Sequence, residues 1–223
     1  GIAAGAMATA MPASAEPVTV RVGYSSMPAH LIPTFYVHKE ALKHYGDSYV
    51  VETTRFNGST PQITALAAGE IDFAALSPTA LAIGIENADL DVKVVGDIIQ
   101  DGVTGHYSQT IYVKTDSGID TPEDLKGKTV GVNAFGSAVD MALRSMLSKV
   151  GLDGQTDLRV IETSFSNMLP MLEDDKIDAG PIVQPLASQM VEAGKYKALF
   201  SSADAIGPTQ FVFLVASTSF LEK

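Results

Sequence analysis

Short apolar segments recur along the chain, and most are followed by a stretch with helical spacing. Val18 to Tyr24 alternates apolar and polar residues, which is typical of a strand with one buried face. Ala138 to Val150 repeats apolar residues every three or four positions, which is typical of an amphipathic helix. Further strands are predicted over residues 49–56, 71–76, 92–99, 128–132, 158–162 and 177–183. Further helices are predicted over residues 31–45, 58–69, 121–125, 166–174 and 185–193, and another opens at 77–79.

The same plan of strands and helices occurs twice. Leu66 to Asp72 corresponds to Leu172 to Asp178: in both segments a helix ends, a turn follows, and Ile-Asp opens a buried strand. Strands that alternate with helices through short loops predict an α/β fold with parallel or mixed sheets. An internal repeat of this plan predicts two lobes of similar construction.

Two extended, β-prone runs connect the predicted lobes, at 107–114 and 209–215. Two such crossings form a hinge, and a hinge over a cleft allows two lobes to close around a small ligand. The predicted organisation is therefore a first lobe over 16–107, a crossing over 108–114 and a second lobe over 115–208. Residues 209–223 form the return crossing and the start of a truncated segment of the first lobe.

The two ends of the sequence have the features expected of a fragment. Residues 1–15 are uncharged and small or apolar and end in Ala13-Ser14-Ala15, which is typical of a signal-peptide remnant and its cleavage site. We expect cleavage after Ala15, and export to the periplasm. Residues 219–223 read as the first turn of a helix that stops at Lys223. We therefore expect the sequence to be a fragment at both ends.

Composition narrows the chemistry. The 223 residues carry 15 Lys and Arg against 26 Asp and Glu, a formal net charge of −11, which argues against a nucleic-acid binder. Cysteine is absent, so disulfides, thiolate metal sites, cysteine nucleophiles and a lipid anchor on cysteine are excluded within this sequence. The negative charge does not exclude an anionic ligand, because surface charge is screened beyond about 8 Å at physiological salt.

The order and spacing of these segments resemble the periplasmic solute-binding proteins of ABC importers, of the nitrate/sulfonate/taurine type. The resemblance covers Val18 to Lys223 and is carried by residues 21–24 (RVGY), 66–72 (LAAGEID) and 121–132 (TPEDLKGKTVGV). It implies the type II periplasmic-binding fold, with two lobes that each hold a mixed sheet flanked by helices and are joined by two crossing strands. It also implies a monomer without cofactor or catalysis that delivers its ligand to an ABC permease in the inner membrane.

Candidate ligand contacts lie where predicted strands end and helices begin. Ligands of open α/β sheets bind outside the carboxyl ends of the strands, and helix N-termini there favour anions. Hydroxyl and glycine residues that fit this position are Ser25, Ser26, Gly58, Ser59, Thr60, Ser77, Thr79, Gly136 and Ser137. Further polar candidates are His30, His106, Asn133 and Gln184, and Tyr107, Phe135 and Phe165 could form walls for an organic body. The expected ligand is a small organic anion, a sulfonate or a related compound. The same Ser and Thr residues also cap helices in proteins generally, so a purely structural role stays open for each.

Enzyme motifs are weak in this sequence. Gly131 to Ser137 has the glycine spacing of a phosphate-binding loop, but the Lys that such loops require is missing. The histidines lack zinc-ligand spacing, and no G-x-S-x-G elbow is present. The main alternative is a pyrimidine-precursor binding protein or synthesis enzyme on the same fold, which would gather His and acidic groups in the cleft. A third alternative, the effector-sensing domain of a transcription regulator, is disfavoured by the export signal.

Overall fold

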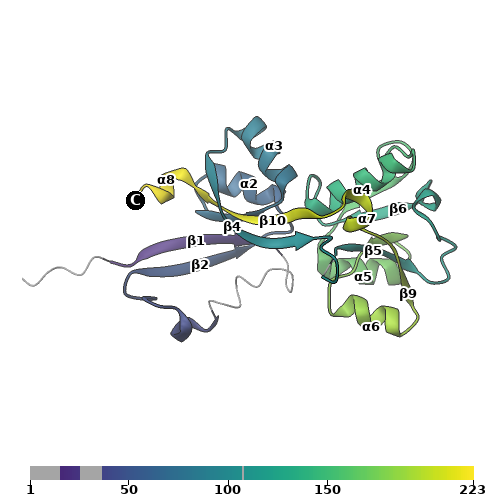
Figure 1. Ribbon diagram of the computed structural model, residues 1–223, viewed down its shortest axis with the longest axis horizontal. Coiled ribbons are helices and arrows are strands. Elements are labelled where there is room, and N and C mark those ends of the chain that lie inside the picture. Colours follow the sequence, from purple (N-terminus) through teal and green to yellow (C-terminus); the bar gives the residue numbers. More distant parts are fainter. Residues whose placement is uncertain (1–15, 26–36, 107) are drawn as a thin grey trace, which may run out of the picture.

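The computed structural model describes residues 16–25, 37–106 and 108–223, and these ranges form two lobes (Figure 1). Each lobe contains one five-stranded mixed sheet with helices packed against it, so the predicted α/β, two-lobed fold is confirmed. The signal-peptide prediction over 1–15 and the candidates Ser26, His30 and Tyr107 lie outside the described residues.

The first sheet has the strand order β2-β1-β3-β10-β4. Its strands are β1 (Val18–Tyr24), β2 (Tyr49–Arg55), β3 (Phe73–Leu76), β4 (Val92–Asp101) and β10 (Thr209–Ser217). The first three run parallel, and β10 is antiparallel to β3 and β4. The accompanying helices are η1 (Lys39–Ala41), α2 (Thr60–Ala67), α3 (Pro78–Ala88) and α8 (Thr218–Leu221). Pro61 and Pro78 lie in the first turns of α2 and α3, where a missing backbone N–H costs nothing.

The second sheet repeats this topology with the order β7-β6-β8-β5-β9. Its strands are β5 (Thr110–Lys114), β6 (Thr129–Val132), β7 (Arg159–Glu162), β8 (Ala179–Pro181) and β9 (Tyr196–Ser201). The helices of this lobe are η2 (Pro122–Leu125), α4 (Ala138–Lys149), α5 (Phe165–Glu173), α6 (Leu186–Glu192) and α7 (Ser202–Ile206). In both sheets three parallel strands are followed by one that returns antiparallel.

The predicted repeat has a matching hydrogen-bond pattern in the two lobes. The Asp72 N–H donates to the Arg21 carbonyl at 2.8 Å, and the Asp178 N–H donates to the Thr129 carbonyl at 2.8 Å. In return, the Asp72 carboxylate accepts from the Arg21 N–H at 2.9 Å and the Asp178 carboxylate from the Thr129 N–H at 2.7 Å. Each Asp thus fastens the strand that follows it to the neighbouring parallel strand, β1 in the first sheet and β6 in the second. The two Ile-Asp turns are structurally equivalent.

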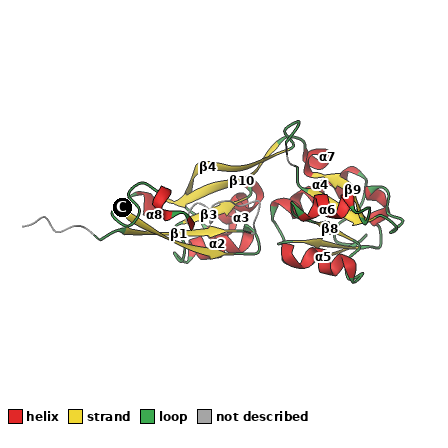
Figure 2. Ribbon diagram, turned by 90° about the horizontal axis from the view of Figure 1, so that it is seen from below, coloured by secondary structure: helices red, strands yellow, loops and turns green. Residues whose placement is uncertain are grey.

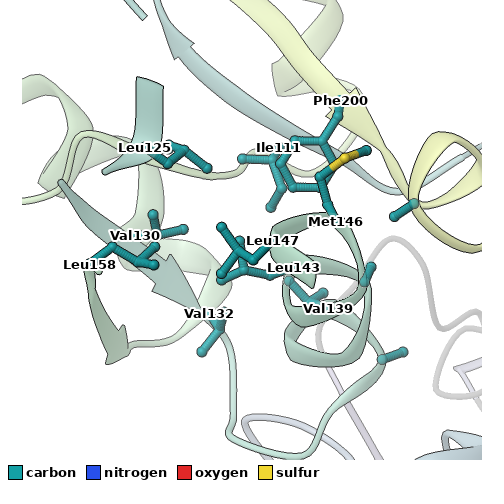
Figure 3. Packing of buried hydrophobic residues seen from close by; sticks show 14 of the residues in the cluster. Ile111, Leu125, Val130, Val132, Val139, Leu143, Met146, Leu147, Leu158 and Phe200 are labelled. Atoms are coloured by element: carbon teal, nitrogen blue, oxygen red, sulfur yellow. The ribbon is translucent and has the colours of Figure 1, made fainter. Parts of the chain in front are cut away.

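Buried aliphatic side chains of α4 hold the second lobe together. Leu143 and Leu147 lie against Val130 and Val132 of β6, with other core residues around them (Figure 3). Leu143 is fully buried, in agreement with the periodic helix predicted over 138–150. Burying a Leu side chain contributes roughly 1.5–3 kcal/mol, so this face orients α4 firmly on the sheet. Its N-terminus is thereby placed beyond the carboxyl end of β6.

The connection between the lobes differs from the predicted crossing. Most of the run predicted to cross between the lobes, 108–114, is β5, which pairs with β8 and β9 inside the second sheet. The extended link consists of β4 and β10, which pair antiparallel and extend from the first sheet toward the second lobe (Figure 2). Buried Asp101 ends β4 and accepts hydrogen bonds from the Ser108 hydroxyl at 2.5 Å and the Gln109 N–H at 2.9 Å. This carboxylate fastens the turn that leads from β4 into β5.

Two local predictions need correction. Of the helix predicted over 31–45, the part described from residue 38 on holds only the single 3-10 turn η1, because the backbone departs from helical geometry at His38 (φ −99°, ψ 62°) and Leu42 (φ −91°, ψ 114°). The strand β9 and the helix α7 were not predicted at all. No helix in the described ranges is long and apolar enough to cross a membrane.

Candidate functional site

A pocket lies at the hinge, between the ends of β4 and β10 and the helix starts of both lobes. Its volume is about 40 Å³. Hydroxyl and amide groups supply its polar wall: Ser25 and Ser59 from the first lobe, and Gln109, Asn133 and Ser137 from the link and the second lobe. Apolar side chains supply the rest: Ile99, Ala138, Val139, Phe165, Phe211 and Val212. None of these lining residues carries a charge.

Ser59 is placed by a network inside the first lobe. Its hydroxyl accepts from the Ser77 N–H at 3.0 Å, so it joins the starts of α2 and α3 and makes no side-chain cap bond in α2. Ser77 is fully buried, caps α3 by accepting from the Ala80 N–H at 3.2 Å, and does not line the pocket. Behind both, the fully buried Gln62 amide donates to the Gly58 carbonyl at 3.0 Å and accepts from the Ala75 N–H at 2.9 Å. This network fixes the first-lobe side of the pocket.

Asn133 and Ser137 form the second-lobe side. Asn133 directly follows β6, and its Oδ1 accepts from the Ser137 hydroxyl at 2.9 Å. Ser137 also caps α4, accepting from the Asp140 N–H at 3.3 Å. The Asn133 Nδ2 donates across the gap between the lobes to the Asn57 carbonyl at 3.0 Å. Both predicted residues therefore lie in the pocket with defined orientations.

Other predicted candidates lie at the contact between the lobes and do not line the pocket. The Thr60 hydroxyl donates to the Phe135 carbonyl at 2.7 Å, and the Thr79 hydroxyl contacts the Met141 sulfur at 2.6 Å. Thr79 and Gly136 line a separate groove of about 510 Å³ between α3 and α4. Gly136 adopts φ 73° there, a conformation that favours glycine.

His106 and Gln184 are not brought to the pocket. His106 is exposed in the turn after β4, and its backbone N–H donates to the Val103 carbonyl at 3.0 Å. Gln184 is half-buried, and its Oε1 accepts from the Ser188 hydroxyl at 2.8 Å. Of the two predicted walls that the structure describes, Phe165 lines the pocket, whereas Phe135 is 44% exposed and lies outside it.

The sequence interpretation missed the contribution of the link. Gln109 is buried and lines the pocket, held by the bond of its N–H to Asp101. Ile99, Phe211 and Val212 form its apolar back wall. The sequence predicts strand for these residues. Their position in or beside the runs expected to cross between the lobes was the feature that could have identified them as pocket residues. Among the described residues, no group of three or more His, Asp or Glu side chains is placed to hold a metal ion.

Residues 51–223 match the family model described as NMT1/THI5 like. The chain belongs to this family. A Brucella abortus (strain 2308) protein named "Putative binding protein BAB2_1146" is 30% identical over 182 residues, which is 81% of this chain and 52% of that protein. The chain thus spans about half the length of the curated relatives it matches.

Solved structures of the same fold include proteins named as binding proteins. The alkanesulfonate-binding protein SsuA of Xanthomonas axonopodis pv. citri, bound to MOPS, aligns with a TM-score of 0.73 and 23% identity over 93% of this chain and 68% of its own. The nitrate-binding protein NrtA of Synechocystis PCC 6803 aligns with a TM-score of 0.67 and 14% identity over 93% of this chain and 57% of its own. These likenesses confirm the expected two-lobed periplasmic-binding fold.

Proposed function

We propose that this chain is the solute-binding component of an ABC importer and captures a small organic anion between its lobes. The carrying observation is the hinge pocket, in which Ser59, Asn133 and Ser137 present hydroxyl and amide groups from two lobes, with no carboxylate among the lining residues that the structure describes. Family membership and the binding-protein neighbours support the same assignment.

Neutral donors suit an anion of low charge. Hydroxyl and amide groups donate hydrogen bonds to oxyanions without adding charge of their own. The apolar side chains of Phe165, Phe211 and Val212 would contact an organic body attached to that anion. A sulfonate or a related compound fits both halves of this pocket.

Access to the pocket requires the lobes to move. Residues of both lobes line it, so the ligand would enter while the lobes are apart and be enclosed when they close. Bending of the paired β4 and β10 at the link would open the pocket, as in hinge closure generally. Release of the ligand to a permease would use the same motion.

Export and oligomeric state follow the same proposal. Structural neighbours such as NrtA are periplasmic proteins, and we propose that this chain is exported, with cleavage after Ala15, and acts as a monomer beside its permease. The pyrimidine alternative is not favoured, because the described pocket lining contains neither His nor an acidic residue.

Thermal unfolding of the purified chain tests the proposal. Methanesulfonate, taurine, MOPS, nitrate and a pyrimidine are each added, and a true ligand at 100 times its Kd adds about 2.7 kcal/mol to the free energy of unfolding. For a chain of this size the midpoint should then rise by roughly 5–11 °C. A rise with the pyrimidine alone, and with none of the anions, would refute the anion assignment.

A further inference from the structure

The two lobes touch through groups that lie outside the pocket. The Thr60 hydroxyl at the start of α2 donates to the Phe135 carbonyl in the loop after β6 at 2.7 Å, and neither residue lines the pocket. On its other side Phe135 is held within the second lobe, where its N–H donates to the Glu162 carboxylate at 2.9 Å. The Phe135 carbonyl that accepts the Thr60 hydrogen bond therefore belongs to a segment whose orientation is fixed by the second lobe.

Gly58 lies at the same contact and has no side chain to keep the lobes apart. A Cβ placed on Gly58 would lie 2.6 Å from the Asn133 Nδ2 and 2.9 Å from the Ala134 Cβ, closer than Cβ atoms approach other atoms. The nearest atoms to that position all belong to the second lobe. Gly58 does not adopt the left-handed backbone conformation that would by itself favour glycine. The glycine is therefore needed for the approach of the lobes and not for the local turn.

We propose that Gly58 and Thr60, together with Asn133, Ala134 and Phe135, form a closure contact that holds the lobes together before any ligand binds. The closure contact differs from a ligand site because Thr60 and Phe135 bond to each other across the lobes. It stabilises the closed arrangement by direct protein contacts. The share of molecules in the closed form is thus set by these residues.

For ligand binding, the inference rests on the proposed function and reassigns Gly58 and Thr60 from ligand contacts to closure residues. A residue that changes only the balance between open and closed forms alters the affinity for every ligand of the closed form by the same factor. A residue that contacts the ligand alters affinities selectively. Ser59 and Ser137, which line the pocket, should behave in the second way.

The test measures the distance between the lobes in the full chain without ligand. The sequence has no cysteine, so Glu70→Cys in the first lobe and Glu192→Cys in the second give one pair of exposed labelling positions for fluorescence transfer. Three variants are compared in this background: Gly58→Ala, Thr60→Val, and Thr64→Val as the matched control on an exposed position of the same helix. Chemical unfolding of each variant verifies that it is folded.

We expect Gly58→Ala to move molecules toward the longer distance, because its new methyl group would meet the Asn133 side chain and the Ala134 Cβ, which cannot rotate away. Thr60→Val should shift the ratio of closed to open molecules on the order of fivefold, the effect of one lost hydrogen bond. Thr64→Val should match the parent chain. Unchanged distances in folded Gly58→Ala and Thr60→Val would overturn the closure contact, whether or not any ligand is found.

Affinity provides the second measurement. The Kd values of methanesulfonate and nitrate are measured for the parent chain and for Thr60→Val. For each anion that binds, Thr60→Val should raise the Kd by the same factor by which it lowers the closed fraction. A selective loss for one ligand would instead identify Thr60 as a ligand contact and overturn the reassignment. If neither anion binds the parent chain, the proposed anion specificity fails, while the distance measurement still decides the closure contact.

Discussion

Replacing Asn133 by Asp changes one atom of the pocket and tests whether an anion binds beside this side chain. The side chain is 4% exposed, and its Nδ2 lies 3.0 Å from the Asn57 carbonyl oxygen. In Asn133→Asp a carboxylate oxygen replaces this donor with almost no change of shape. The substitution removes one bond between the lobes and places a negative charge in a pocket proposed to hold an anion.

The expected loss of affinity can be bounded in two ways. Two like charges about 4 Å apart repel by about 4 kcal/mol at the effective dielectric typical of such sites. The new Asp can avoid the repulsion by taking up a proton, which at pH 7 costs about 4 kcal/mol for an ordinary Asp, at 1.36 kcal/mol per pKa unit. Both routes predict binding weaker by about a thousandfold. Because the second route uses a proton, affinity should recover by up to about tenfold for each pH unit below 7.

Isothermal titration with the best anion of the thermal screen, between pH 5 and pH 8, measures this effect. Asn57→Asp is the matched control, since it adds the same charge on an exposed side chain of the neighbouring loop. We expect the control to change affinity little and to show no comparable dependence on pH. A loss of less than about tenfold in Asn133→Asp, or a loss that does not depend on pH, would refute an anion seated beside Asn133.

Three further predictions concern the scaffold. Gln62→Leu should lower the free energy of unfolding by about 2–4 kcal/mol in urea titrations, because the Gly58 carbonyl and the Ala75 backbone lose their partner. Gln62→Glu should not rescue this loss, because it sets a buried carboxylate against the Gly58 and Ala75 carbonyl oxygens. Leu143→Ala should cost about 2–5 kcal/mol in the same assay, since the side chain is fully buried in the core of the second lobe, and a cost below 1 kcal/mol would contradict that packing. Burial of Asp72 by itself would raise its pKa, but the hydrogen bonds and charge of Arg21 lower the pKa of its carboxyl below the ordinary value. The stabilisation from the Asp72 carboxylate is therefore present above the unfolded pKa of about 4 and is lost as pH falls through the lower folded pKa. The difference in free energy of unfolding between the parent and Asp72→Asn should shrink below about pH 4. A difference that stays constant down to about pH 2 would disprove the assignment.

Local pattern predicted most of the elements and several of the site residues. The alternation in Val18 to Tyr24 and the helical period after Ser137 match β1 and α4 because each element buries one face, and burial leaves a period in the sequence. The repeated Ile-Asp turn could be identified because corresponding residues occur at the same point of the plan in both halves. Asn133 and Ser137 could be placed at the pocket because they end a strand and start a helix, and in α/β sheets such ends lie at one edge.

Contacts between distant segments were decided by the tertiary structure. Thr60 and Phe135 are 75 residues apart, and the sequence around each shows only a helix start and a loop. Ser77 has the same local pattern as Ser59, yet the packing of α3 buries it completely while Ser59 lines the pocket. Periodicity records which face of an element is buried, but not which other element covers it. By itself the sequence therefore determined the two-lobed α/β plan and the chemical type of the pocket, whereas the path of β4 and β10 determined which residues line it and which hold the lobes together.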